Sequence, residues 1–513
     1  MKALRILCAV LALVMLVAVF AACGNNAGGP EKGTNGSGTK ESGNSGSKET
    51  GGSSNPDETS GESSGEKETD PEDPFVYTDL PDDIDLGGFN FNIYYSRRGL
   101  NIVNVAEDKT GDIIEDALFD STSYVTEKYN CTITAVEKGG DQEFANAVKV
   151  SAQNGDKDFS LSIGHDTLTI NNALSGYYLD IKSLQTPNFD KPWWPKDAMD
   201  SISIGKKLYA AVTHLSYSSS ANANMIVYNR MLANDKNIEI PYPDIWKGTW
   251  YLSKMIDMSK EGYNDANADG TIQIEDGETY GFLCGVSCTF SLQAGWGVLP
   301  VLKDEDDLPY YGLDGERAFN FLQAFEELTG PGSGSFIKAN NSDHVAMFKE
   351  NGSLFIISNG LSVYKDLRGI DGLSYGYLPV PKFDESQEDY ASCGSDILWA
   401  LAAAQEENKE KIAVIVEELS CQNYNNVIPA FFESTLKTKL SESPEDMRVV
   451  EIVRDTYMLP FAYFYNTRLG GSASMSELPR YTTSSTVSSY IGDNWEALDG
   501  KIKDLIELLG TLN

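Results

Sequence analysis

The sequence predicts an α/β fold divided into two lobes, and three observations support this prediction. Segments with strand-like and helix-like periodicity alternate through the first third of the body. The chain from Phe75 to Asn513 is longer than one hydrophobic core usually supports. The body is also rich in Tyr, Trp and Phe, which indicates a globular protein.

The elements predicted for the first third follow the order strand, helix, strand, helix, strand. They span residues 89–95, 112–129, 131–136, 142–153 and 158–164. This order implies a parallel sheet with helices on its faces. Ligands of such sheets bind beside the loops at the carboxyl ends of the strands.

The rest of the body is more mixed and carries glycine-rich loops between about residues 229 and 384. Further strands are expected at 353–358 and 397–402. Amphipathic helices are expected at 409–419, 444–457 and 495–509.

The N-terminus has the pattern of an export signal. Basic Lys2 and Arg5 precede an apolar run that ends in Ala21-Ala22-Cys23. We expect residues 1–22 to be removed and Cys23 to carry a lipid, which would hold the protein at the outer face of the cytoplasmic membrane. Ordinary cleavage without a lipid is the alternative.

Residues 23–75 are expected to form the lipidated cysteine and a disordered tether. The stretch from 25 to 74 consists almost wholly of Gly, Ser, Asn, Thr, Glu, Lys and Pro, so it cannot bury enough apolar surface to fold. A coil of this length spans about 40 Å. It would lift a folded body off the membrane without releasing it.

Charge and cysteine content exclude some classes of partner and of metal site. The net charge of −36 argues against partners such as nucleic acid or an anionic membrane surface, and otherwise indicates solubility. Five cysteines lie in the body, with no spacing typical of zinc, and we expect buried, mainly free thiols: Cys131, Cys284, Cys288, Cys393 and Cys421. Pairing of Cys284 with Cys288 stays open.

Several motifs occur in an order typical of one protein family. They are Gly-Lys-Lys-Leu-Tyr at 205–209, Ile-Val-Tyr-Asn-Arg at 226–230, Tyr-Gly-Tyr-Leu-Pro-Val-Pro-Lys at 375–382 and Asn-Asn-Val-Ile-Pro-Ala at 425–430. Together they resemble the extracellular solute-binding lipoproteins of ABC importers and, more distantly, maltodextrin-binding proteins. The resemblance covers roughly residues 85–491.

This resemblance implies a periplasmic-binding-protein-like clamp of type II. Lobe 1 would comprise residues 85–225, lobe 2 residues 226–391, and residues 392–513 would return to lobe 1. Crossing strands are expected near 222–228 and 392–399. Such a protein is a monomer and not an enzyme; it captures a mono- or oligosaccharide by closing its lobes and delivers it to a membrane permease.

The resemblance also suggests solute-binding residues. Gly164-His165-Asp166 matches the His-Asp that follows the third strand in the maltodextrin-binding pattern, so Asp166 would accept hydrogen bonds from sugar hydroxyls. Asp166 could also cap a helix that begins at Thr167, and the two roles are compatible. Ile356-Ile357-Ser358-Asn359 lacks that pattern's tryptophans, which argues against maltodextrin itself, and Asn359 stays a candidate.

Aromatic rings are expected to cover the apolar face of a sugar. The candidates are Trp194, Phe290 and Trp296, and core packing is the alternative for each tryptophan. In an extended loop the adjacent Trp193 and Trp194 would point in opposite directions, so that one could lie in the core and the other be exposed. Asp396, at the second crossing, is a candidate hinge or ligand contact.

Residues 265–276 fit the spacing of an EF-hand calcium loop, with glycine at its sixth position. The expected Ca²⁺ ligands are Asp265, Asn267, Asp269, Thr271, Gln273 and Asp276. The ion would be structural, and an Asx-turn loop without an ion is the alternative.

Two other function classes stay open. A secreted glycoside hydrolase would use paired carboxylates, which so acidic a chain could supply. A surface sensor or adhesin could share the clamp fold without transport. The sequence has only three histidines and no His-Glu-x-x-His motif, which favours the binding protein.

Overall fold

The structure is a computed structural model that describes residues 75–330, 333–338, 341–359, 363–367, 370–394, 397–433 and 444–512. These residues fall within one compact unit. The unit contains two larger sheets and a short two-stranded ribbon. Each larger sheet has its own hydrophobic core, so we refer to lobe 1 and lobe 2.

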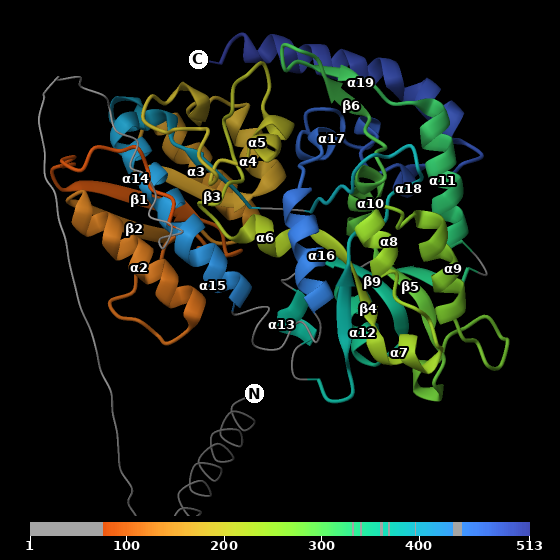
Figure 1. Cartoon of the computed structure of the whole chain (residues 1–513). Coiled ribbons are helices and arrows are strands. Elements are labelled where there is room, and N and C mark those ends of the chain that lie inside the picture. Colours follow the sequence, from red (N-terminus) through yellow and green to blue (C-terminus); the bar gives the residue numbers. More distant parts are fainter. Residues whose placement is uncertain are drawn as a thin grey trace, which may run out of the picture. The chain divides into compact units, whose positions relative to one another are not determined.

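The sheet of lobe 1 has the strand order β11-β3-β1-β2, and Figure 1 labels β1, β2 and β3. Its strands are β1 (Phe89–Tyr95), β2 (Cys131–Glu137), β3 (Leu161–His165) and β11 (Ile397–Leu401). Strand β1 pairs in parallel with β2 and β3, while β11 runs antiparallel to β3. The predicted parallel sheet is therefore confirmed, and β11 is the strand by which the chain returns to lobe 1.

Local sequence accounts for the elements of this lobe. Helix α2 (Ile113–Lys128) begins after Asp112, whose side chain accepts hydrogen bonds from the backbone N–H groups of Ile114 and Glu115. Helix α3 (Asp141–Asn154) ends at Gly155, which adopts a left-handed conformation at φ 71°. Both helices lie where the hydrophobic periodicity predicts them.

The sheet of lobe 2 has the order β10-β4-β9-β5-β8. Its strands are β4 (Asn224–Asn229), β5 (Tyr280–Gly285), β8 (Ser335–Lys338), β9 (Ser353–Asn359) and β10 (Tyr375–Leu378). Strand β5 is parallel to β8 and β9, whereas β4 is antiparallel to its neighbours β9 and β10. Two parallel strands, β5 and β9, thus end at the same edge.

Helices surround both sheets (Figure 1). Those of the first two thirds are α4 (Asp166–Ala173), α5 (Lys196–Ile202), α6 (Ser218–Asn222), α7 (Arg230–Asp235), α8 (Tyr242–Lys247), α9 (Leu252–Gly262), α10 (Thr289–Gly295), α11 (Gly315–Thr329), α12 (Asn341–Lys349) and α13 (Tyr364–Leu367). Those of the last third are α14 (Lys409–Gln422), α15 (Ile428–Phe432), α16 (Pro444–Asp455), α17 (Phe461–Phe464), α18 (Leu478–Tyr481) and α19 (Val487–Leu509). In the described part of the chain, no helix is both long and apolar enough to cross a membrane.

The C-terminal third packs on both lobes, although we expected it to return to lobe 1 as a whole. Helix α14 contributes Ile412 and Ile415 to the core of lobe 1. Helix α16 instead contributes Val449 and Val450 to the core of lobe 2. A buried ion pair between Asp446 of α16 and Arg230 fixes this docking, because it supplies the charge partner that a buried carboxylate needs.

Three chain segments meet where the lobes join. The backbone N–H of Asn224, at the start of β4, donates to the carbonyl of Cys393 at 3.0 Å. The N–H of Ser392 donates to the carbonyl of Thr456 at 3.0 Å. The five cysteines of the body are buried thiols, as expected.

Candidate functional site

The carboxyl ends of β1 and β3 lie side by side in lobe 1. Tyr95 pairs with Ile163 in parallel register, and His165 pairs with Ile397 at the start of β11. The residues that follow these strands, Arg98 and Asp166, therefore lie at the same edge of the sheet. This is the edge at which α/β sheets bind ligands.

Four charged or titratable side chains gather at this edge. The Nε and Nη2 atoms of Arg98 donate to the carboxylate of Asp141 at 2.8 and 2.7 Å. This bond holds the pKa of Asp141 below its ordinary range. The Nδ1 atom of His165 lies 2.8 Å from Oδ1 of Asp166. The carboxylate of Asp141 is thus held in place by Arg98, and that of Asp166 lies beside the imidazole of His165.

Asp166 is 0% exposed and is the first residue of α4 rather than the residue before it. Its Oδ1 atom accepts a hydrogen bond from the backbone N–H of Thr167 at 2.5 Å. The helix begins one residue earlier than the capping alternative requires, but the carboxylate still binds a free N–H of the first turn. Asp166 is therefore fixed at the site edge by both its helix and His165.

The matching edge of lobe 2 is formed by the carboxyl ends of β5 and β9. Strand β5 leads through a short turn into α10, which carries Phe290. Asn359 is the last residue of β9 and pairs with Asn224 at the start of β4. Asp396, the candidate at the second crossing, lies outside the described residues.

Phe290 and Tyr463 connect the two edges. Their rings stack with centroids 3.8 Å apart and an interplanar angle of 9°. Tyr463 belongs to α17, which packs against α4, the helix that begins with Asp166. Of the residues predicted from sequence, Asp166 and Phe290 are thus brought to one place.

Sequence reasoning missed Tyr463 and the arginines near it. Hydrogen bonds to Asp141 raise the pKa of Arg98, and the nearby Asp166 and Tyr463 add to this effect. Hydrogen bonds to Glu477 raise the pKa of Arg480, and Tyr463 again contributes. The phenol thus lies within electrostatic range of two guanidinium groups. The only sequence signal was the aromatic run at 461–465.

The two candidate tryptophans lie in the cores instead. Trp194 is 2% exposed, and its indole N–H donates to Oε2 of Glu417 at 2.8 Å. Trp193 is also buried and donates to the same oxygen at 3.3 Å, so the expected exposure of one ring is wrong. Trp296 packs edge-on against Phe321 inside lobe 2. These contacts match the core-packing alternative.

Comparison with solved structures supports the two-lobed arrangement. A cyclo/maltodextrin-binding protein complexed with maltotetraose is 15% identical, with a TM-score of 0.51 over 82% of this chain and 96% of that one. The GacH receptor of Streptomyces glaucescens is 13% identical, with a TM-score of 0.50 over 83% and 100%. A solute-binding protein of Thermotoga lettingae bound to α-D-tagatose is 13% identical, with a TM-score of 0.50 over 82% and 100%.

The chain has the two-lobed fold of these binding proteins. No protein-family model and no curated protein sequence matches it. The likeness therefore lies in the path of the backbone, since so few residues are shared.

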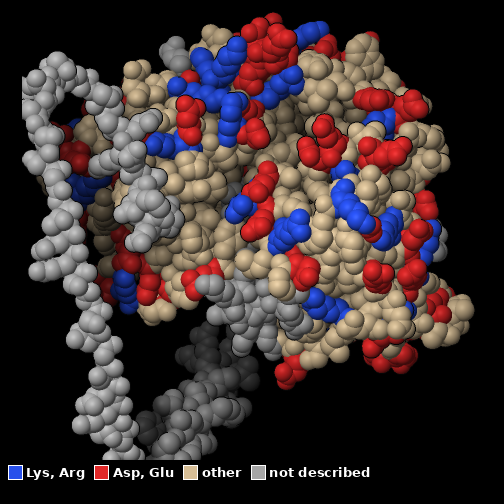
Figure 2. Space-filling view, in the orientation of Figure 1, with Lys and Arg blue, Asp and Glu red and all other residues tan. Residues whose placement is uncertain are grey.

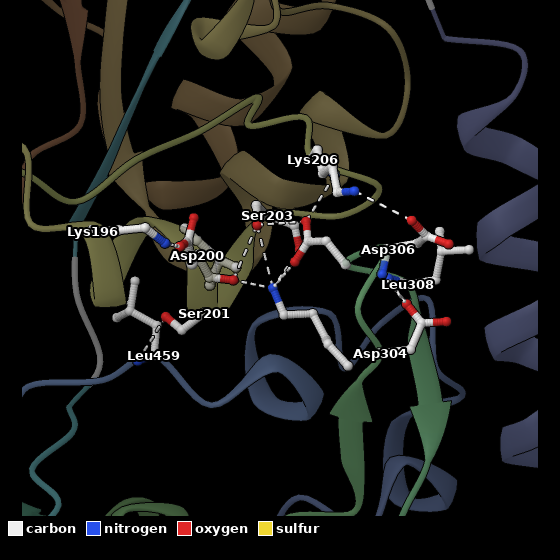
Figure 3. Close-up of polar contacts among 12 residues, drawn as sticks. Lys196, Asp200, Ser201, Ser203, Lys206, Asp304, Asp306, Leu308 and Leu459 are labelled. Carbon is white, nitrogen blue, oxygen red and sulfur yellow. Dashed lines mark hydrogen bonds and ion pairs between the residues drawn. The ribbon is translucent and has the colours of Figure 1, made fainter. Parts of the chain in front are cut away.

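The hairpin between α10 and α11 packs on lobe 1, and Val301 of its first strand lies in the core of that lobe. Strands β6 (Val301–Lys303) and β7 (Pro309–Tyr311) flank Asp307, whose carboxylate accepts from Oγ of Ser203 at 2.7 Å and from the backbone N–H of Lys206 at 2.9 Å. Lys303 completes the contact by bonding Asp307 at 2.6 Å and the carbonyl of Asp200. Figure 3 shows Asp200, Ser203 and Lys206 at this contact, which we call the interlobe hairpin contact.

A cavity of about 230 Å³ lies near the junction of the lobes, where α5 begins and α16 ends. It is lined by Pro195, Lys196, Asp197, Ala198, Val212, His214, Arg454, Asp455 and Tyr457. Burial lowers the pKa of His214 to about 4, so this imidazole is neutral at pH 7. None of the predicted solute-binding residues lines this cavity, which is separate from the site at the strand ends.

The predicted calcium loop folds back on itself. Asp265 accepts from the N–H of Gly270 at 2.9 Å and Asn267 accepts from that of Asp269 at 2.8 Å. Within the described residues, no three His, Cys, Asp or Glu side chains are grouped as metal ligands. Calcium binding at this loop therefore stays a prediction.

The buried carboxylate of Glu278 binds backbone N–H groups of this loop. Glu278 is 1% exposed and accepts from the N–H groups of Ala266 at 3.0 Å and Gln273 at 2.9 Å. The side chain of Asp276, expected to close the loop, is exposed. Sequence reasoning missed Glu278 because it lies two residues beyond the twelve-residue pattern.

Proposed function

We propose that the protein is the extracellular substrate-binding component of an ABC importer. It captures a carbohydrate between its lobes, closes on it, and delivers it to a membrane permease. One observation carries this proposal: strand ends of two separate sheets converge on Asp166 and the stacked rings of Phe290 and Tyr463. The solved structures of the same fold hold maltotetraose, acarbose and α-D-tagatose, which supports a carbohydrate as the solute.

The chemistry of the site suits a sugar. Hydroxyls at the edge of a sugar ring need acceptors and donors, and Asp166, His165 and Arg98 supply both. The apolar face of the ring needs an aromatic surface, which Phe290 and Tyr463 supply. Asp166 and Phe290 are already buried, and closure of the lobes would exclude further water, which strengthens each hydrogen bond.

The same carboxylates are poorly suited to glycoside hydrolysis. A hydrolase needs one carboxylic acid whose raised pKa keeps it protonated as the general acid. The pKa of Asp141 is instead lowered by Arg98, and Asp166 is bonded to His165. Asp141 is thus arranged to stay an ionised acceptor, which favours binding over turnover.

The N-terminus completes the proposal. Residues 1–22 would direct export, Cys23 would carry the lipid, and residues 23–75 would tether the body at the outer face of the membrane. Acidic and basic side chains are interspersed on the visible face of the body (Figure 2). Such a surface suits a soluble body held near a membrane by its anchor rather than by a basic patch.

A thermal-shift screen tests the solute class. The mature protein is heated with members of a sugar, amino-acid and peptide library, and a bound solute raises the melting temperature by mass action. We expect the largest shift from a mono- or oligosaccharide. A shift from amino acids or peptides alone would contradict the carbohydrate assignment.

A further inference from the structure

Asn224 has a side-chain amide whose oxygen is unused. It is 1% exposed, and its Nδ2 atom donates to Oγ of Ser291. Its Oδ1 atom is buried and accepts no hydrogen bond from any described residue. A buried amide oxygen without a donor costs about 1–3 kcal/mol, so its retention needs a reason.

Asn224 lies where the elements of the candidate site meet. It is the first residue of β4 and pairs with Asn359 at the carboxyl end of β9. Its side chain bonds Ser291, the residue after Phe290 in α10. Its backbone N–H donates to Cys393 at the second crossing. Asn224 therefore contacts the residue next to Phe290 in α10, at the junction of the lobes.

A purely structural role does not account for this amide. Asn423 also has a buried, unpartnered Oδ1 atom, but its Nδ2 donates to the carbonyls of Ile102 at 2.9 Å and Leu215 at 2.7 Å. These two bonds join segments far apart in the chain, so Asn423 stabilises their packing. Asn224 donates only to a hydroxyl, which can rotate to other partners.

We propose that Asn224 is a solute-binding residue whose Oδ1 atom accepts a hydrogen bond from a hydroxyl of the bound carbohydrate. This inference rests on the proposed function. The amide is enclosed in the present structure, so the lobes must part before the hydroxyl reaches it. The bound sugar then supplies the missing donor, and a sugar lacking that hydroxyl is rejected because the oxygen is again left unpaired.

The test uses three variants of the mature protein in calorimetric titrations with a carbohydrate panel that includes maltotetraose and α-D-tagatose. Asn224→Leu removes the oxygen at similar volume, and we expect affinity to fall about 10- to 100-fold while the melting temperature holds or rises. Asn224→Asp keeps an acceptor oxygen, so it binds more tightly than Asn224→Leu although a buried charge makes it less stable. Asn224→Asp should thus be the tighter binder of the two variants but the less stable one. Opposite rankings for affinity and stability indicate a contact with the solute.

Ser353→Ala is the matched control. Ser353 lies at the opposite end of β9, and its buried Oγ also has no hydrogen-bond partner among the described residues. Affinity should be unchanged in this variant. If Asn224→Leu binds as tightly as the wild type, or if Asn224→Asp is the weaker binder, the inference falls while the proposed function stands. If the wild type binds no carbohydrate of the panel, both fall.

Discussion

The ring of Phe290 lies flat against that of Tyr463, with centroids 3.8 Å apart. This contact joins α10 of lobe 2 to α17, which packs on α4 of lobe 1. In the proposed function, it occupies the point at which a sugar ring would stack. Solute entry therefore requires the two rings to separate, and each ring then offers one face to the sugar.

Truncation of either ring should weaken binding. We expect Tyr463→Ala and Phe290→Ala each to lower carbohydrate affinity about tenfold or more, because each removes one aromatic face. Tyr463→Phe keeps the face and should retain most of the affinity. Calorimetric titration measures both effects, and equal affinity for Tyr463→Ala and the wild type would remove this ring from the site.

Asp166 should be needed for binding more than for folding. Asp166→Asn leaves an acceptor oxygen for the backbone N–H of Thr167 but removes the charge that faces His165. We expect affinity to fall about tenfold, since charge-assisted hydrogen bonds to sugar hydroxyls are lost. The circular dichroism spectrum should stay that of the wild type. The control is Asp108→Asn, the same change at an exposed position, which should leave affinity unchanged.

The interlobe hairpin contact should hold the lobes together. Asp307→Ala removes the acceptor for Ser203, for the backbone N–H of Lys206 and for Lys303. We expect a larger radius of gyration in small-angle scattering without solute and a weaker apparent affinity, because less of the protein is closed. The exposed pair Lys206–Asp306 gives the control. Lys206→Ala should leave both quantities unchanged, and an unchanged radius for Asp307→Ala would show that this contact does not restrict opening.

Stability should fall with rising pH because of Glu417. Burial raises the pKa of this carboxyl from 4.5 to about 7. Between these values the folded protein binds a proton that the unfolded chain releases, so the free energy of unfolding decreases as pH rises through this window. The full effect is about 3 kcal/mol. Glu417→Gln keeps an acceptor for Trp194 and should flatten the pH dependence in urea unfolding; an unchanged slope would contradict the raised pKa.

Calcium should stabilise lobe 2 if the loop at 265–276 binds it. We expect added Ca²⁺ to raise the melting temperature and a chelator to lower it, with both effects lost in Asp265→Ala. Two further variants compare Asp276, the last ligand expected from the sequence pattern, with Glu278, the carboxylate that the structure places in the loop. Glu278→Gln should reduce the shift more than Asp276→Ala, because Glu278 lies inside the loop. A melting temperature that ignores both ion and chelator would reject the site.

Local patterns predicted the elements, while contacts between distant residues decided the site. Strand β1 was predicted at its observed bounds because its residues alternate, and α2 was predicted within one residue at each end because its apolar residues have helical spacing. The burial of Trp194 depends on Glu417, which lies 223 positions away, so no local signal could reveal it. Tyr463 and Asn224 likewise became candidates only once the fold placed them beside Phe290 and Ser291.

One measurement tests the central claim most directly: calorimetric injection of a carbohydrate that passes the thermal-shift screen into the mature protein. We expect heats that saturate at one solute per protein and return to baseline after each injection, because the protein captures the solute without turning it over. A sustained heat flow after each injection would indicate hydrolysis and contradict the account. So would the absence of any saturable heat.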